Sequence, residues 1–76
     1  MENQLLHQSP DGIPLKVTSV ADDRLGAKMT EMGIVEGKVM RILFRAPFGC
    51  PIAVDMGGYI LSLRKQEAQL IHVAQI

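Results

Sequence analysis

The chain has 76 residues, of which 47% are hydrophobic and 21% charged, and this composition is that of one folded domain. Eight basic and eight acidic residues cancel and are scattered along the sequence, so we expect no binding of nucleic acid or anionic lipid through net charge. Charged residues interrupt the apolar stretches well before the ~20 residues that cross a bilayer, so we predict no insertion into a membrane.

The start of the chain and its cysteine content indicate the compartment. Residues 1–7 lack the basic start and the apolar segment of a signal peptide. Cys50 is the single cysteine, so an internal disulfide is excluded and a reducing environment is favoured. We therefore expect a cytoplasmic protein whose stability comes from packing.

The N-terminal part predicts a lead-in, a strand and a helix within a single domain over residues 1–76. Residues 1–11 are expected to form a loose lead-in, which a turn at Pro10–Gly12 closes. Apolar residues then predict a strand at about residues 14–20. Apolar residues at i, i+4 and i+7 predict a helix at about residues 23–32.

Three residues define this helix. Asp22 is placed to cap its start and Gly33 to end it. Gly26 lies inside the helix, where glycine costs about 1 kcal/mol relative to alanine. That cost would be explained if another backbone passed closely at this position.

The C-terminal part predicts four strands and a helical turn. Alternating apolar residues indicate strands from Met40 to Ala46 and from Ile52 to Met56, and Gly57–Gly58 predicts a tight hairpin to the next strand. A helical turn at 65–69 would lead to a last strand at 70–73. The facing pairs of the hairpin would be Met56 with Tyr59, Val54 with Leu61 and Ile52 with Leu63, all six on one face.

One short helix and about five short strands indicate a mostly β domain. A small domain removes most of its unpaired strand edges by curling the sheet into a barrel. We predict a small, partly open SH3-like barrel, with an OB-like barrel as the alternative. A strand edge that stayed free would allow a homo-oligomer.

The sequence contains no recognisable catalytic set. The candidates Cys50, His7, His72, Asp55 and Glu67 lack the patterned partners of a nucleophile or a general base, so we predict that the protein is not an enzyme. Cys50 and His72 are the candidate ligands for ferrous iron or zinc, although no two ligands stand at the spacing of known sites. No cofactor is firmly predicted.

The most distinctive segment is the loop between the second and third predicted strands. It contains Pro47, Phe48, Gly49, Cys50 and Pro51, and its two prolines limit the entropy that the loop would lose on docking. Phe48 either contacts a partner or folds back over the mouth of the barrel. Both alternatives remain open at the level of the sequence.

This loop and its surroundings resemble the FeoA family over roughly residues 12–74. The residues that carry the resemblance form four groups in the family's order and spacing. They are Gly12 with Val17; Met32, Gly33, Ile34 and Gly37; Ala46, Pro47, Phe48, Gly49, Pro51, Ile52 and Val54; and Gly58, Leu63, Arg64, Glu67, Ala68, Ile71 and Val73.

The resemblance implies a cytoplasmic, SH3-like accessory protein of ferrous-iron uptake. The implied partner is FeoB, a membrane ferrous-iron transporter with a cytoplasmic GTP-binding domain, and Lys28 and Arg64 are expected beside the loop as partner contacts. It also raises the hypothesis of GTPase activation, for which Arg24, Arg41, Arg45 and Arg64 are the candidate arginine fingers.

The chain departs from the family pattern at two places. Lys28 and Met29 stand where an arginine and a leucine are usual, so the forked guanidinium is lost. Cys50 stands where aspartate is common, so a charge beside the loop is missing.

Two other functions are considered beside partner binding. The same domain type occurs at the C-terminus of iron-dependent repressors, so a free-standing transition-metal-binding module is the alternative function. An RNA-binding barrel would use Arg41 and Arg45, which share a predicted strand face, but we expect that face to be merely solvated.

Overall fold

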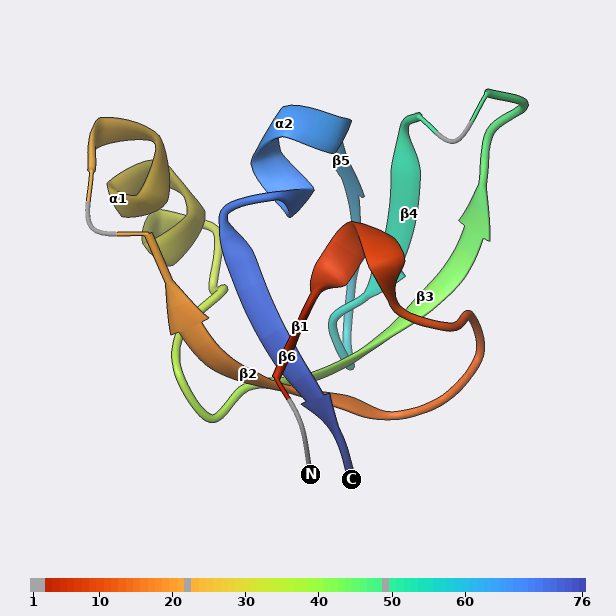
Figure 1. The fold of residues 1–76 in the computed structure, drawn as a ribbon, viewed down its shortest axis with the longest axis horizontal. Helices are drawn as coiled ribbons and strands as arrows, with labels where there is room; N and C mark the ends of the chain where they lie inside the picture. Colours follow the sequence, from red (N-terminus) through yellow and green to blue (C-terminus); the bar gives the residue numbers. More distant parts are fainter. Residues whose placement is uncertain (1–2, 22, 49) are drawn as a thin grey trace.

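The structure of the chain is a computed structural model that describes residues 3–21, 23–48 and 50–76. Within these residues, six antiparallel strands form one strongly bent sheet in the order β1-β6-β2-β3-β4-β5 (Figure 1). The elements are β1 (Gln4–Leu5), the 3-10 helix η1 (Leu6–Gln8), β2 (Leu15–Val20), α1 (Arg24–Glu31), β3 (Val39–Arg45), β4 (Ile52–Asp55), β5 (Ile60–Leu63), α2 (Lys65–Ala68) and β6 (Ile71–Gln75). The predicted mostly β, partly open SH3-like barrel is confirmed.

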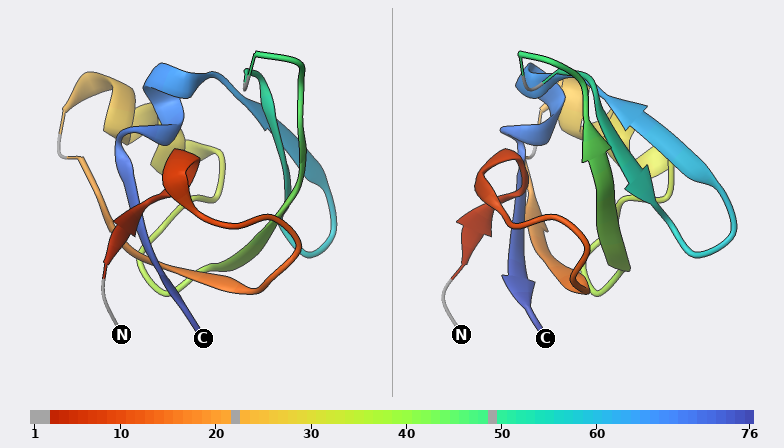
Figure 2. Two further views of the ribbon diagram at one scale, coloured as in Figure 1. Left: turned by 45° about the vertical axis from the view of Figure 1, so that its right-hand side comes forward. Right: turned by 90° about the vertical axis from the view of Figure 1, so that its right-hand side faces the viewer.

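Two register shifts bend this sheet around its core. One lies between Val17 and Ser19 in the β2–β6 pair, and the other lies between Ile42 and Phe44 in the β3–β4 pair. Such bulges increase the local twist, so the sheet curls as two further views show (Figure 2). The sheet does not close, because β1 and β5 stand at its two ends.

The N-terminal segment, residues 4–11, is packed onto the sheet and is not a loose lead-in. β1 pairs with β6, and Leu6 of η1 is completely buried in the core. The side chain of Arg45 holds the segment from the other side. It donates hydrogen bonds to the carbonyl oxygens of His7 and Ser9, and its Nε lies 2.9 Å from Oδ1 of Asp11.

The expectation that Arg45 lies on a solvated face with Arg41 was therefore wrong. The bulge between Ile42 and Phe44 changes the alternation of side chains along β3, so the two arginines have different surroundings. Arg41 is exposed, whereas Arg45 is partly buried against the N-terminal segment.

The helix α1 starts one residue later than predicted. Asp23 is its N-cap, and Oδ1 of Asp23 accepts a hydrogen bond of 2.8 Å from the backbone N–H of Gly26. Asp22, the predicted cap, lies outside the described residues. A close backbone approach at Gly26 is confirmed, because an ideal Cβ there would lie only 1.7 Å from the carbonyl oxygen of Ala21.

The hairpin of β4 and β5 has the predicted register. Ile52 pairs with Leu63 and Val54 with Leu61, and the backbone N–H of Met56 donates to the carbonyl of Tyr59 at 2.9 Å. The tyrosine is the exception to the predicted buried face, because its side chain is 47% exposed. The other apolar side chains of the hairpin's inner face pack into or against the core.

Met29 of α1 and Ala68 of α2 also reach this core, so both helices pack on the barrel. Among the described residues, no helix is both long and apolar enough to span a membrane.

Candidate protein-binding site

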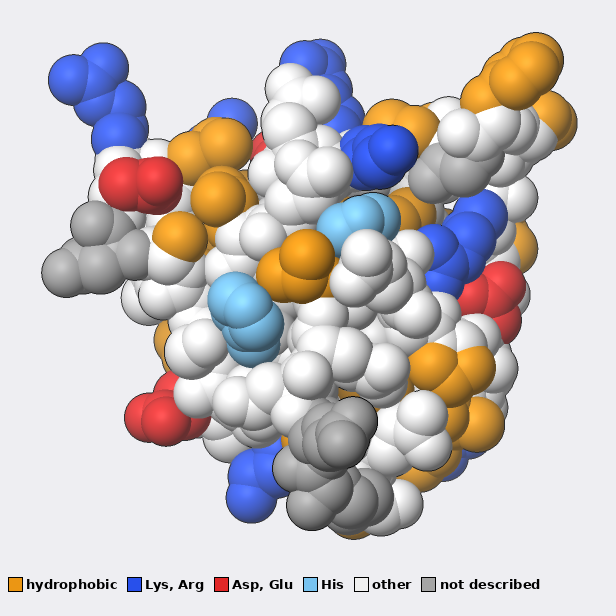
Figure 3. Space-filling model, viewed as in Figure 1, with side chains coloured by type: hydrophobic (Ala, Val, Ile, Leu, Met, Phe, Trp, Pro, Cys, Tyr) orange, Lys and Arg blue, Asp and Glu red, His pale blue; other side chains and the backbone are white. Residues whose placement is uncertain are grey.

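The 46–51 loop connects β3 to β4, and its described residues, 46–48 and 50–51, project from the barrel as an arm (Figure 1). A hydrogen bond of 3.0 Å from the N–H of Ala46 to the carbonyl of Pro51 closes its base. Phe48 at its tip is fully exposed and has a φ of 74°, a backbone conformation that bulky residues rarely adopt. Hydrophobic side chains are visible at the end of this arm in the space-filling view (Figure 3). Phe48 therefore does not fold back over the barrel.

Cys50 joins this loop to α2. Its side chain is exposed, and its Sγ accepts a hydrogen bond of 3.3 Å from the backbone N–H of Lys65, the first residue of α2. The first N–H groups of a helix have no intrahelical acceptor, and the sulfur of Cys50 accepts the hydrogen bond of one of them. The loop is consequently held at Cys50 as well as at its base.

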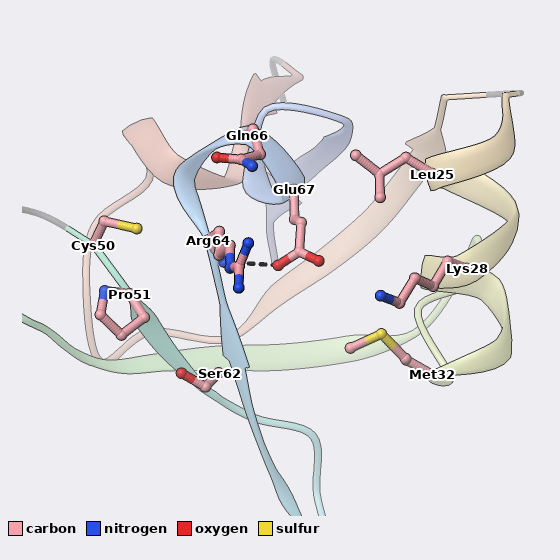
Figure 4. Close-up of a pocket in the computed structure, with 9 residues that line it drawn as sticks. All are labelled: Leu25, Lys28, Met32, Cys50, Pro51, Ser62, Arg64, Gln66 and Glu67. Carbon is pink, nitrogen blue, oxygen red and sulfur yellow. Dashed lines mark hydrogen bonds between the residues drawn. The ribbon is translucent and has the colours of Figure 1, made fainter.

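A groove of about 690 Å³ lies between α1, the end of the loop, β5 and α2. Lys28 and Met32 point from α1 across the groove toward Arg64 and Glu67 (Figure 4). The residues that line the groove are Leu25, Lys28, Met32, Cys50, Pro51, Ser62, Arg64, Gln66 and Glu67. The groove is therefore amphipathic, with methyl-bearing side chains beside charged ones.

The charged side chains around the groove differ in whether they have partners. Oε1 of Glu67 accepts a hydrogen bond of 2.8 Å from the backbone N–H of Arg64. Within the described part of the chain, neither the Lys28 ammonium nor the Arg64 guanidinium forms a salt bridge. Two cations thus face the groove with one carboxylate that is already hydrogen-bonded.

One end of the groove is braced by Tyr59. Its hydroxyl donates a hydrogen bond of 2.8 Å to the carbonyl of Met32, at the C-terminal end of α1. Gly33 follows with a φ of 93°, and an ideal Cβ there would lie 2.4 Å from the Tyr59 hydroxyl. The start of β5 is therefore fixed to the end of α1 through a position where a side chain would collide.

His7, which lies near Arg45, has a lowered pKa. Burial lowers the pKa of His7 below its ordinary value of 6.5, and the charges of Lys65 and Arg45 lower the pKa further. Its Nδ1 atom is buried and has no hydrogen-bond partner within the described residues. The neutral imidazole is thus the form that the fold favours.

The structure brings four of the predicted partner-contact residues together. Lys28, Cys50, Pro51 and Arg64 all line the groove. Pro47 and Phe48 belong to the projecting arm instead, and Gly49 lies outside the described residues. The prediction from sequence did not include five residues that line the groove: Leu25, Met32, Ser62, Gln66 and Glu67. For Glu67 a signal was present, because a glutamate three residues after the residue that precedes a helix typically accepts that residue's backbone N–H.

The predicted metal ligands are not gathered into a site. Cys50 lines the groove, whereas His72 lies on β6 and is not among the lining residues. Across residues 3–21, 23–48 and 50–76, no three side chains of His, Cys, Asp or Glu are grouped so as to hold a metal ion. Metal binding remains a prediction from the sequence.

The barrel, with its groove and its projecting apolar loop, defines a small domain of the SH3-like class. The FeoA domain model matches residues 5–75, so this chain belongs to the FeoA family, a family of non-enzymatic accessory proteins. The match begins seven residues before the predicted resemblance at residue 12, and it thereby includes most of the packed N-terminal segment.

Solved structures support this assignment. A FeoA-like protein from Clostridium acetobutylicum is 35% identical with a TM-score of 0.91, and the match covers 100% of this chain and 90% of that one. Iron(II) transport protein A from Clostridium thermocellum is 32% identical with a TM-score of 0.88; the match covers 96% of this chain but only 46% of that one. Comparison with curated proteins gives no match.

A manganese-dependent transcriptional repressor shares the fold. It is 24% identical with a TM-score of 0.85, and the match covers 97% of this chain and 42% of the repressor. At this identity the likeness concerns the fold alone.

Proposed function

We propose that this chain is a cytoplasmic accessory protein of ferrous-iron uptake that binds an FeoB-type membrane transporter through the 46–51 loop. Membership of the FeoA family supports the process, and a relative in Clostridium thermocellum is described as an iron(II) transport protein. The partner is inferred from the family, and the contact surface is inferred from the geometry of the loop.

The exposure of Phe48 is the observation that carries this proposal. Burying a phenylalanine side chain is favourable by about 1.5–3 kcal/mol. Phe48 is fully exposed at the tip of the arm, so this free energy is not used in folding and is available for binding a partner. Its positive φ costs about 1–3 kcal/mol, and such strain is concentrated at functional sites. The fold thus holds Phe48 in a strained backbone conformation with its side chain in water.

The loop is also prepared for docking by its attachments. The hydrogen bonds at Ala46 and Cys50 hold it at its base and beside α2. A loop that is ordered before binding loses less conformational entropy when a partner immobilises it. Phe44, on the adjoining end of β3, is 61% exposed and extends the apolar surface.

GTPase activation would need an exposed arginine. The guanidinium of Arg45 is engaged by the N-terminal segment, so Arg45 is not suited to act as an arginine finger. Arg24, Arg41 and Arg64 are exposed. A GTP hydrolysis rate of the transporter that does not change when this protein is added would remove the activation hypothesis.

The proposal is tested by co-purification with the full-length transporter of the same host, with GTP, with GDP and without nucleotide. We expect the wild-type protein to be retained in at least one of these states and the Phe48→Ala variant to be lost. Failure of the wild-type protein to be retained in any state would contradict the proposal. Direct binding of ferrous iron or zinc through Cys50 or His72 would then be tested by calorimetry.

A further inference from the structure

We infer that the free edge of β5 and the adjoining groove bind a short, extended, acidic segment of a partner protein, which adds to the sheet as a further strand. The identity of that partner as the transporter rests on the proposed function, whereas the chemistry of the segment does not. Three features of the molecule favour such a segment: the backbone groups of β5, the shape of the groove and its charges.

The register of the hairpin shows which backbone groups of β5 are free. In an antiparallel pair, every second pair of residues exchanges hydrogen bonds. Because Met56 and Tyr59 are hydrogen-bonded, Val54–Leu61 and Ile52–Leu63 are the other bonded pairs. The N–H and C=O groups of Ile60 and Ser62 consequently point away from β4, and β5 has no other neighbour in the sheet among the residues that the structure describes.

This edge is short because both of its ends are occupied. At the start of β5, the hydroxyl of Tyr59 crosses to the carbonyl of Met32. At its end, the outward N–H of Arg64 is taken by Oε1 of Glu67. The four free groups of Ile60 and Ser62 lie between these contacts, and both residues are exposed. They would serve a segment of only a few residues.

The groove provides the opposite wall for such a segment. It separates β5 from α1, and Leu25, Lys28 and Met32 of the helix line it across from Ser62 and Arg64 (Figure 4). Strand addition uses backbone hydrogen bonds for affinity and pockets for alternate side chains for specificity. Here Leu25 and Met32 offer apolar contacts on the wall that faces the free edge.

The charges of the groove select an acidic occupant. Lys28 and Arg64 lack salt-bridge partners within the described residues, and the one acidic lining residue, Glu67, already accepts the N–H of Arg64. The whole chain has a net charge of zero, so this excess of cations is local. A carboxylate of the segment would pair with the forked guanidinium of Arg64 or with the Lys28 ammonium.

A second copy of this chain is a less suitable occupant. Symmetric pairing of two β5 strands would bring the groove of each copy, with its Lys28 and Arg64, close to that of the other. Like charges placed together weaken such a contact. Electrostatic complementarity therefore favours an acidic segment of a different protein.

The Ser62→Pro variant tests the edge itself. Proline removes the outward N–H of Ser62 but no hydrogen bond to β4, and proline is tolerated on edge strands where the N–H faces solvent. Ser62→Ala is its matched control, because alanine removes the hydroxyl and keeps the N–H. Lys28→Glu is a second variant that does not depend on the tolerance of β5 for proline.

The probe is a seven-residue peptide of alternating valine and glutamate, and the control peptide has lysine in place of glutamate. Both are titrated into ¹⁵N-labelled protein and followed by NMR. We expect the acidic peptide to shift the amide signals of Ile60, Ser62 and Lys28, and the lysine peptide to leave them in place. We expect binding to weaken roughly tenfold in Ser62→Pro and Lys28→Glu but not in Ser62→Ala. Equal effects of the two peptides, or no shift at these positions, would overturn the inference.

The same variants in the transporter co-purification separate this inference from the proposed function. Loss of retention in Phe48→Ala with full retention in Ser62→Pro and Lys28→Glu would leave the loop as the docking site and refute the groove as a transporter contact. Absence of wild-type retention, together with the expected shifts from the acidic peptide, would refute the transporter as partner and leave the strand-addition site established.

Discussion

The sulfur of Cys50 accepts a hydrogen bond from the backbone N–H of Lys65 at 3.3 Å, so the 46–51 loop is fastened to the first turn of α2. A thiol sulfur is a weak acceptor, whereas a carboxylate at a helix start is a strong one. We predict that Cys50→Asp raises the free energy of unfolding by about 0.5–1 kcal/mol. Cys50→Ala, which removes the acceptor, should lower it slightly, and urea titration of the three proteins measures both effects. A less stable Cys50→Asp protein would show that this contact does not hold the loop.

Phe48 is predicted to reduce stability while it serves binding. Its φ of 74° suits glycine far better than a bulky residue, so Phe48→Gly should raise the free energy of unfolding by about 1 kcal/mol. Phe48→Ala should have little effect, because alanine keeps the strain and the lost side chain is fully exposed. Thermal unfolding distinguishes the two variants. Destabilisation of both by more than about 1 kcal/mol would mean that Phe48 packs against the fold.

Arg45 is predicted to stabilise the N-terminal segment through backbone carbonyls more than through its ion pair. Arg45→Met removes the donors to the carbonyls of His7 and Ser9, and we expect it to lower the free energy of unfolding by about 1–3 kcal/mol. Asp11→Asn removes only a half-exposed charge and should cost under about 1 kcal/mol. Faster amide exchange in β1 and its partner β6 should accompany the first variant only. Equal costs for the two variants would contradict this division.

His7 is predicted to make the protein less stable in mild acid. The folded-state pKa of His7 is below the unfolded-state value of 6.5, so the unfolded chain binds the additional proton first. Stability that is present above pH 6.5 is therefore lost as the pH falls below 6.5 and through the folded-state pKa. His7→Gln should lose less stability than wild type between about pH 7.5 and pH 5.5, measured by urea titration at each pH. Parallel losses in the two proteins would contradict the assignment.

Much of the barrel followed from local patterns. The alternation along β4 and β5 and the Gly57–Gly58 turn together fix the register of the hairpin, because a slip by one residue would expose its buried face. The cost of glycine inside a helix correctly indicated a close backbone contact at Gly26.

The features that escaped prediction depend on contacts between distant residues. The role of Arg45 arises from a bulge in β3 and from carbonyl oxygens 36 and 38 residues away, for which the sequence carries no local signal. The packing of the N-terminal segment has no local signal for the same reason, because the burial of Leu6 depends on the pairing of the preceding strand β1 with β6. Of the candidate site, the loop was visible as a proline-bracketed apolar segment. The groove was not, because its walls come from four separate elements.

The measurement that tests the central proposal most directly is the affinity of this protein for the full-length transporter in lipid nanodiscs, compared with the affinity of Phe48→Ala. The matched control is Ile76→Ala, because Ile76 is also exposed and lies near the C-terminus, at the end of the molecule away from the loop (Figure 1). Loss of a buried phenylalanine contact should weaken binding by about 10- to 100-fold, and the control should bind like wild type. Equal affinities of wild type and Phe48→Ala would contradict the account.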